Sequence, residues 1–216
     1  MDRILYTYFR SSAAYRVRIA LNLKGLMATQ IPVHLVRDGG EHLKPEYKAI
    51  NPQGLVPVFG EDGMRVSQSL AILEYLEEKY PGTPLLPTAL ADRAYVRQLA
   101  LVIACEIHPI NNLRVLKYLT GTLGVADAAK TDWIKHWIAQ GFEALEAEIT
   151  AAGHSGGFCF GDTPTLADCC LVPQIFNARR FEVDLSPYPT LSAIDERCAA
   201  LPAFQQAHPS VQADAQ

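Results

Sequence analysis

Strand and helix patterns alternate through the first 80 residues of the chain, and only helical spacing follows them. Residues 4–9 are apolar and aromatic, which is typical of a strand buried on at least one face. Residues 12–23 repeat apolar side chains at helical spacing, and Gly25 is a natural stop after a basic last turn. Continued to residue 80, the patterns predict the order β-α-β-α-β-β-α.

The other elements of this half follow from turn residues and short apolar runs. We predict a second strand at residues 31–36, with Pro32 near its start, where a missing N–H donor suits an edge strand. A short helix near residues 45–50 leads to a strand that ends at Phe59. A turn at residues 61–63 then connects to a strand at 64–66, and a helix over 70–79 ends at Pro81.

Strand patterns are absent after Asp92, and four segments carry helical spacing: residues 92–120, 127–150, 165–180 and 190–206. Residues 81–91, rich in Pro, Thr and Ala, are typical of a linker. We therefore expect a small α/β domain at residues 1–82 and a larger all-helical domain at residues 90–212. We expect the residues after Pro209 to fray.

Charge and hydropathy exclude several classes of partner. The formal net charge is −4, so neither nucleic acid nor an anionic membrane surface is indicated. No apolar run approaches the roughly 18 residues of a membrane span, and the first residues lead into a strand instead of a signal peptide. We expect a cytoplasmic protein.

Cysteines and histidines show no pattern of a metal or redox site. The five cysteines are an odd number without CxxC spacing, which favours buried thiols in a reducing compartment. The six histidines, His154 among them, are scattered, so no metal is expected. The cluster from Asp162 to Asp168 has acidic residues, but Thr165 and Asp168 have the spacing of a structural capping box.

Two serines stand where the first strand passes into the first helix. A helix N-terminus presents free N–H groups and partial positive charge, so an anion beside Ser11 and Ser12 is favoured. The serines could equally serve only as helix caps, which is a common role at such a turn. From the local residues both interpretations stay open.

Segments spread over nearly the whole chain, from Leu5 to about His208, resemble the zeta class of glutathione S-transferases, the class of maleylacetoacetate isomerases. They are residues 8–12, 16–21, 51–57, 68–72 and 167–189. The resemblance implies a thioredoxin-like N-terminal domain and an all-α C-terminal domain that contributes to the substrate site. It also implies glutathione as cofactor and a homodimer.

One departure from the family pattern is Ala13, because the family usually has cysteine directly after the paired serines. The bacterial maleylpyruvate isomerase branch also lacks this cysteine, and residues 108–112 and the pair Arg179-Arg180 resemble the same branch. The substrate and its degradation pathway stay open between maleylpyruvate and maleylacetoacetate.

The resemblance implies cis–trans isomerisation of a small dicarboxylate enone, in which a glutathione thiolate adds to the double bond and later leaves. A thiol of pKa about 8.5 is only about 3% ionised at pH 7. One hydrogen bond to the anion, worth about 1.5–3 kcal/mol, and a helix end, worth about 0.3–1 kcal/mol, suffice to lower that pKa by about 2 units. We expect Ser11 to be the main donor, Ser12 a second donor or cap, and Arg10 to bind substrate charge.

Further site residues follow from the same resemblance. Arginine forks suit the substrate carboxylates, and the candidates are Arg180 and Arg114, although exposed arginines often have no such role. For glutathione we expect backbone pairing at Val56 and side-chain contacts from several polar residues: His42, Gln53, Gln68, Ser69, His108 and Asn112. His108 could instead be a core histidine, and Arg16 and Arg18 are expected to form structural ion pairs.

Two other functions share much of this pattern. A general glutathione transferase that conjugates or dehalogenates small α-halo acids would use the same Ser11 and the same glutathione contacts. A non-catalytic module with this fold would have no reason to combine Ser11, Gln68 and Ser69. Thioredoxin-type exchange is disfavoured because no cysteine lies between Arg10 and Lys24.

Overall fold

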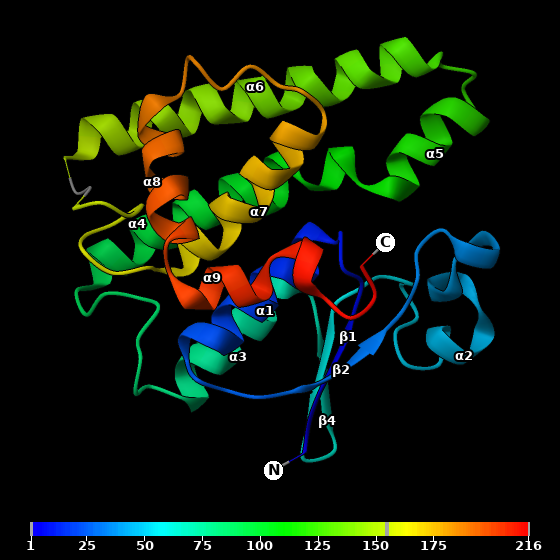
Figure 1. Cartoon of the computed structure of the whole chain (residues 1–216), viewed down its shortest axis with the longest axis horizontal. Helices are drawn as coiled ribbons and strands as arrows, with labels where there is room; N and C mark the ends of the chain where they lie inside the picture. The colour runs from blue at the N-terminus through cyan, green and yellow to red at the C-terminus, as the bar shows by residue number, and fades with distance from the viewer. Residues whose placement is uncertain (1, 154–155, 216) are drawn as a thin grey trace. The chain divides into compact units, whose positions relative to one another are not determined.

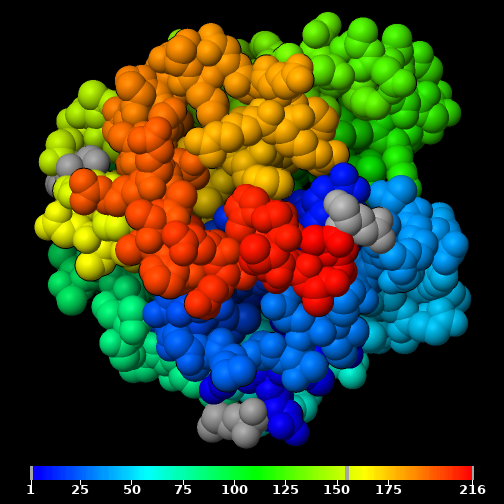
Figure 2. Space-filling model, in the orientation of Figure 1, coloured from blue at the N-terminus to red at the C-terminus, as the bar shows by residue number. Residues whose placement is uncertain are grey.

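The structure is a computed structural model that describes residues 2–153 and 156–215, which are the coloured parts of Figure 1 and Figure 2. Its contacts divide the chain into two compact units, one containing the residues up to Leu85 together with those from Leu201 onward, and the other containing Leu86–Ala200. The sequence pattern had assigned residues 201–212 to the helical domain. They belong to the first unit because helix α9 (Pro202–Ala207) packs against helix α1 (Ser12–Leu23).

The first unit contains a four-stranded mixed sheet in the order β2-β1-β3-β4 (Figure 1). Strand β1 (Arg3–Thr7) pairs parallel with β2 (Thr29–Pro32) and antiparallel with β3 (Val58–Glu61), which pairs antiparallel with β4 (Met64–Ser67). Helix α2 (Pro45–Lys48) precedes β3, and α3 (Ser69–Lys79) follows β4. This is the predicted order β-α-β-α-β-β-α, so the thioredoxin-like fold is confirmed.

Strand β2 begins two residues earlier than predicted and ends at Pro32 instead of residue 36. The parallel ladder ends where Thr7 pairs with Pro32, because β1 itself ends at Thr7. Beyond it, Val33 donates one further backbone hydrogen bond to Thr7, at 2.7 Å, and its side chain is buried. The expectation that Pro32 requires an edge position is consistent with the sheet order, since β2 is an edge strand.

The second unit is helical throughout its described residues. It contains α4 (Leu90–Leu101), α5 (Leu113–Gly121), α6 (Asp127–Ala152), α7 (Leu166–Arg180) and α8 (Pro189–Ala199). The predicted helix over 92–120 is interrupted by a π-helical turn at Val102–Ile107 and a 3-10 turn at Pro109–Asn111. Pro109 has no N–H for a continuing α-helix, and Pro202 divides the predicted segment 190–206 for the same reason.

One helical stretch among the described residues, Leu90–Gly121, is long and apolar enough to be compared with a membrane span. It is divided by the turns just described, and its buried side chains, Val96, Leu99, Ile103 and Ile107, form part of the core of the second unit. Helix α7 packs against α4 within that unit. The stretch is therefore part of the helical domain.

The capping box predicted at the start of α7 is present. Asp168 is fully buried and accepts hydrogen bonds from the Thr165 backbone N–H at 2.7 Å and from the Thr165 hydroxyl at 2.9 Å. It also accepts one from the backbone N–H of Cys159, at 2.8 Å. These contacts explain Asp168 as a structural residue of the helix start.

The residues after Pro209 do not fray as expected. Pro209–Val211 form a 3-10 turn, and the Gln212 side chain is buried. Its amide donates to the carbonyls of Gln206 and His208, at 2.9 Å each. Local composition suggested disorder, but these hydrogen bonds fix the segment.

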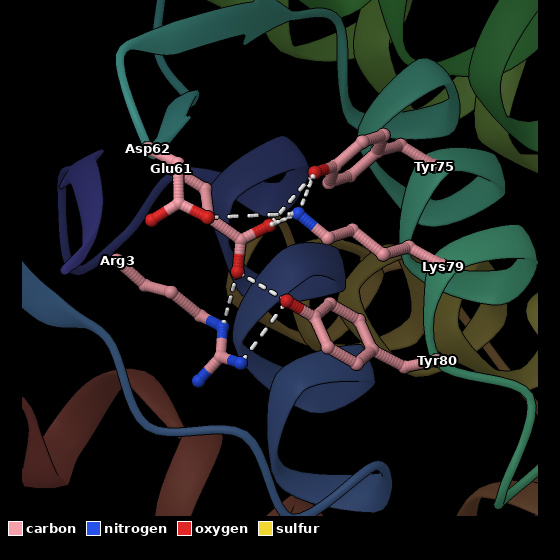
Figure 3. A network of polar contacts seen from close by, with 6 residues as sticks. All are labelled: Arg3, Glu61, Asp62, Tyr75, Lys79 and Tyr80. Carbon is pink, nitrogen blue, oxygen red and sulfur yellow. Dashed lines mark hydrogen bonds and ion pairs between the residues drawn. The ribbon is translucent and has the colours of Figure 1, made fainter. Parts of the chain in front are cut away.

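A buried carboxylate, Glu61 at the end of β3, joins the first strand to α3 (Figure 3). It accepts from Arg3 Nε at 2.7 Å, from the Tyr75 hydroxyl at 2.7 Å and from Lys79 Nζ at 2.8 Å, and it also accepts from the Tyr80 hydroxyl. Burial alone would raise the pKa of Glu61, but the four donors outweigh it and lower the pKa from 4.5 to about 2. The ionised form is thus part of the folded state.

We predict that Glu61→Gln lowers the free energy of unfolding at pH 7 by roughly 3 kcal/mol, because Arg3 and Lys79 lose the buried carboxylate that both contact. The folded pKa of Glu61, about 2, lies below the reference value of 4.5, so its contribution is complete above that value and is lost as the pH falls towards 2. Denaturant unfolding of wild type and variant at several pH values measures this difference, which should shrink in acid.

The control for this experiment is Glu78→Gln, which removes an exposed carboxylate from α3, the helix that carries Tyr75 and Lys79. Its difference from wild type should be small at every pH. A constant difference between wild type and Glu61→Gln from pH 7 to pH 2 would contradict the role of the ionised carboxylate.

Candidate active site

The turn between β1 and α1 places Ser11 at the N-terminus of the helix. The backbone N–H of Ser11 donates to the carbonyl of Tyr8 at 3.0 Å, which closes the turn. The Ser11 hydroxyl accepts from the backbone N–H of Ala14 at 3.2 Å, so Ser11 is the helix cap. A hydroxyl that accepts a hydrogen bond keeps its own proton to donate. Capping and donation to an anion, considered as alternatives from the sequence, are therefore compatible in one residue.

Ser12 differs from Ser11 in accessibility. It is the first residue of α1 and is 5% exposed, whereas Ser11 is partly exposed. A ligand beside the turn therefore reaches the Ser11 hydroxyl more readily than that of Ser12.

Arg10 is exposed and lies over two aromatic rings. Its guanidinium carbon is 5.0 Å from the ring centre of Phe9 and 5.9 Å from that of Tyr8, and its Nη2 donates to the Tyr8 hydroxyl at 3.1 Å. Guanidinium has five N–H donors, so others are left for a carboxylate. The rings orient the side chain without using up its capacity to bind an anion.

Two predicted glutathione ligands that are 15 residues apart in the sequence meet in the structure. The Gln68 side chain donates to the Gln53 side-chain oxygen at 2.9 Å. Gln68 also has a backbone φ of 72° directly before α3, in a region that residues other than glycine rarely adopt. Such strain is concentrated at ligand sites, where the surrounding structure holds the residue in place.

Val56 lies three residues after Gln53, and Ser69 directly follows Gln68. Val56 is buried and precedes Pro57 through a cis peptide bond, just before β3 begins. Ser69 begins α3, and its hydroxyl accepts from Arg16 Nη1 at 3.1 Å. Arg16, for which the sequence predicted an ion pair, thus links α1 to the start of α3.

His42 is buried in a 3-10 turn, Glu41–Leu43, and its position requires a glycine nearby. Gly40 has a φ of 108°, and a Cβ at that residue would overlap the His42 ring. A side chain at residue 40 would therefore be strained and would displace the imidazole.

The other predicted ligands belong to the second unit. Asn112 caps α5, since its side-chain oxygen accepts from the backbone N–H of Arg114 at 3.2 Å, and the Arg114 side chain is exposed. His108 follows the π-helical turn and is partly exposed. The ligand roles of all three residues stay predictions.

The neighbouring arginines at the end of α7 have different surroundings. Arg179 Nη1 forms an ion pair with the buried Asp195, at 2.5 Å. Arg180 is exposed, with its guanidinium carbon 4.9 Å from the ring centre of Phe181. Both arginines are exposed, but the ion pair with Asp195 gives Arg179 a structural role. The ligand role of Arg180 stays a prediction.

Two residues hold the Ser11 turn in ways that the sequence does not predict: Arg18, whose partners differ from the expected ones, and Asp214, for which no role is predicted. Arg18 was expected to form an ion pair, but its hydrogen bonds within the described part of the chain go to backbone carbonyls and one hydroxyl, Thr7. Asp214 Oδ2 accepts from the backbone N–H of Phe9, at 3.0 Å. Nothing local in the sequence indicates a contact across 205 residues.

Within residues 2–153 and 156–215, no three His, Cys, Asp or Glu side chains are grouped to hold a metal ion. His154 lies outside the described residues.

Comparisons with known proteins agree with this architecture. Residues 5–84 match the glutathione S-transferase N-terminal domain, and residues 131–213 match the C-terminal domain of the same family. A probable maleylacetoacetate isomerase from Vibrio cholerae is 53% identical over 100% of this chain and 99% of its own. A maleylpyruvate isomerase from a Ralstonia species is 50% identical over 97% of this chain and 98% of its own.

Solved structures give the same result. The holo structure of a maleylpyruvate isomerase, described as a bacterial zeta-class glutathione S-transferase, has a TM-score of 0.96 at 49% identity and covers 99% of this chain and 100% of its own. A maleylacetoacetate isomerase from Methylobacterium extorquens, solved with malonate and glutathione, has a TM-score of 0.94 at 41% identity, with 99% of each chain covered. The chain therefore belongs to the zeta class of glutathione S-transferases, the family of the maleylacetoacetate and maleylpyruvate isomerases.

Proposed function

We propose that the protein is a glutathione-dependent cis–trans isomerase that converts maleylpyruvate or maleylacetoacetate to the fumaryl isomer. The observation that carries this proposal is the Ser11 hydroxyl, partly exposed at the N-terminus of α1, in a chain of the isomerase family. It supplies what the reaction needs first, which is a hydrogen-bond donor beside a thiolate.

The reaction is a nucleophilic addition followed by elimination. The glutathione thiolate forms a C–S bond to one carbon of the cis double bond, and the electron pair moves into the conjugated carbonyl as an enolate. The former double bond is then single and rotates. When the enolate collapses, the C–S bond breaks, the trans double bond forms and the thiolate is released unchanged.

Ser11 supports this sequence by stabilising the anion. Its proton can point to the thiolate while its oxygen accepts from Ala14, and the free N–H groups of α1 add partial positive charge. The burial of Ser12 supports Ser11 as the main donor.

Glutathione recognition is assigned to the residues around Gln68. The Val56 backbone offers strand-like pairing to the cysteinyl unit, and Gln68 and Ser69 at the start of α3 suit the γ-glutamyl carboxylate. His42 and Gln53 are assigned to the glycyl end, with His108 and Asn112 as further ligands. Malonate and glutathione in the Methylobacterium enzyme support the pairing of a thiol cofactor with a dicarboxylate substrate.

Arginines are assigned to the substrate carboxylates and the enolate. Arg10 and Arg180 are exposed and each lies beside an aromatic ring, and Arg114 is exposed near the start of α5. The planar fork of an arginine suits a carboxylate better than the point charge of a lysine.

We also propose that the protein is a cytoplasmic homodimer. The five cysteines are free thiols and four of them are buried, which fits a reducing compartment. Light scattering of the purified protein measures the oligomeric state directly.

The experiment that tests the function follows maleylpyruvate and maleylacetoacetate by ultraviolet absorbance, each with and without glutathione. Conversion to the fumaryl isomer that requires glutathione but does not consume the thiol is the expected result. The substrate with the larger kcat/KM identifies the pathway. Accumulation of a stable thioether instead would contradict the proposal and favour the conjugating transferase.

We predict that Ser11→Ala raises the pKa of the bound thiol by about 1–2 units and lowers turnover at neutral pH about 10- to 100-fold, because one hydrogen bond to the anion is lost. The thiolate absorbance of the glutathione complex, titrated with pH, measures the first effect. Ser12→Ala should change both much less. The melting temperature of Ser11→Ala measures the loss of the helix cap, and Ser11→Thr, which keeps the hydroxyl, should stay close to wild type in thiol pKa. A larger effect at Ser12 would reverse the assignment.

We predict that replacing the two arginines at the end of α7 changes different quantities, KM for Arg180 and melting temperature for Arg179. Arg180→Ala should raise KM for the dicarboxylate about tenfold or more with little change in melting temperature, since one charged hydrogen-bonding partner of the substrate is lost. Arg179→Ala should lower the melting temperature, because the buried Asp195 loses its ion pair with Arg179, while KM stays near wild type. Steady-state kinetics and thermal unfolding of both variants check this, and an unchanged KM for Arg180→Ala would remove Arg180 from the site.

A further inference from the structure

The segment at residues 208–215, here called the tail, contacts the turn that carries Ser11. Asp214 Oδ2 accepts from the backbone N–H of Phe9 at 3.0 Å. Ala215 packs against a cluster of buried side chains of the same unit: Tyr8, Phe9, Val33, Tyr47, Val56 and Val58. The tail therefore contacts the turn and packs against the cluster that includes Val56, the residue assigned to pair with glutathione.

Both backbone groups of Phe9 are bonded to distant side chains. Its N–H donates to Asp214, and its carbonyl accepts from Arg18 Nη2 at 2.9 Å. Arg18 also donates to the Thr7 hydroxyl at 3.0 Å and, through Nε, to the carbonyl of Ala207 at 3.0 Å. The peptide two residues before Ser11 is thus held by α1 and by the tail.

The tail has enough internal structure to hold Asp214 in place. The Gln212 side chain is buried and bonded to the carbonyls of Gln206 and His208. The backbone N–H of Ser210 donates to His208 Nδ1 at 3.2 Å, and that of Ala215 donates to the Gln212 carbonyl at 3.0 Å. A carboxylate on an ordered segment can fix its partner, whereas one on a loose end cannot.

We infer that Asp214 is a positioning residue for glutathione activation: it fixes the turn of residues 8–11 so that the Ser11 hydroxyl points at the thiol sulfur. The inference rests on the proposed function, because it assigns a role in the same reaction. A displacement of about 1 Å at a catalytic group can cost about 100-fold in rate, so a contact remote from the chemistry can matter.

The charge of Asp214 would have the opposite effect to its hydrogen bond. A carboxylate near a thiolate raises the pKa of the thiol, because like charges repel. If charge dominated, Asp214→Asn would make the thiol more acidic. If positioning dominates, Asp214→Asn, whose amide oxygen still accepts from Phe9, stays close to wild type, and only Asp214→Ala loses the function.

The experiment compares Asp214→Ala, Asp214→Asn and the control Asp132→Asn, which removes an exposed carboxylate from α6. For each full-length variant, the thiolate absorbance of bound glutathione is titrated with pH, and melting temperature and the pH profile of isomerisation are measured. Asp214→Ala should raise the thiol pKa by about one unit and lower kcat/KM at neutral pH about tenfold, with recovery at higher pH. Asp214→Asn and Asp132→Asn should remain within about threefold of wild type.

A second variant guards against misfolding of Asp214→Ala. Gln212→Ala loosens the tail without removing the Phe9 hydrogen bond, and it should shift the thiol pKa in the same direction. A wild-type thiol pKa in both variants would overturn the inference, as would a more acidic thiol in Asp214→Asn. The titration needs no substrate, so absence of isomerisation by the wild type would overturn the proposed function separately.

Discussion

The buried guanidinium of Arg18 is the interaction on which the Ser11 turn depends. The side chain is 2% exposed, so its desolvation is costly unless its donors are satisfied. It donates to Thr7, Tyr8 and Phe9 at the end of β1 and to Ala207 of α9. Burial lowers the pKa of Arg18 to about 10, with Tyr15 and Asp214 opposing the shift, so the group stays charged at neutral pH. One cation therefore joins the first strand, the first helix and the end of the chain.

Local signals explain how much could be predicted from the sequence. The start of α1, the hairpin and the Thr165–Asp168 capping box depend on residues a few positions apart, and these three features are present as predicted. The predicted helices 92–120 and 190–206 are each divided in the structure. The sequence places strand β2 too late because the apolar run of residues 33–36 lies beyond the ladder: Val33 is buried, but Val36 is 55% exposed and the pairing ends at Pro32. Long-range contacts such as those of Arg16 with Ser69 and of Asp214 with Phe9 leave no local trace in the sequence. The helical spacing alone therefore groups residues 201–212 with the preceding helices, whereas their contacts group them with the first unit.

The residues expected to bind glutathione or its thiolate differ in how far the fold itself accounts for them. Ser11 and Asn112 cap helices, and Ser69 accepts from Arg16, so part of each side chain is already used by the fold. Gln68 differs in its backbone, because its φ of 72° lies in a region that residues other than glycine rarely adopt, while its side chain donates to Gln53 instead of capping α3. Such strain is concentrated at ligand sites, so the backbone of Gln68 supports the glutathione-binding role proposed for it.

Ala13 also becomes understandable from the reaction. In the proposed reaction the nucleophile belongs to glutathione and is returned unchanged, so the protein needs a donor and a positive helix end but no thiol of its own. A cysteine at residue 13 would stand in the first turn of α1, where the same partial charge that stabilises the glutathione thiolate would also lower the pKa of a protein thiol. Alanine removes that competitor and is a better helix former. An isomerase whose only reactive thiol is that of bound glutathione does not need a cysteine beside the paired serines. Alanine at residue 13 is therefore compatible with the proposed reaction.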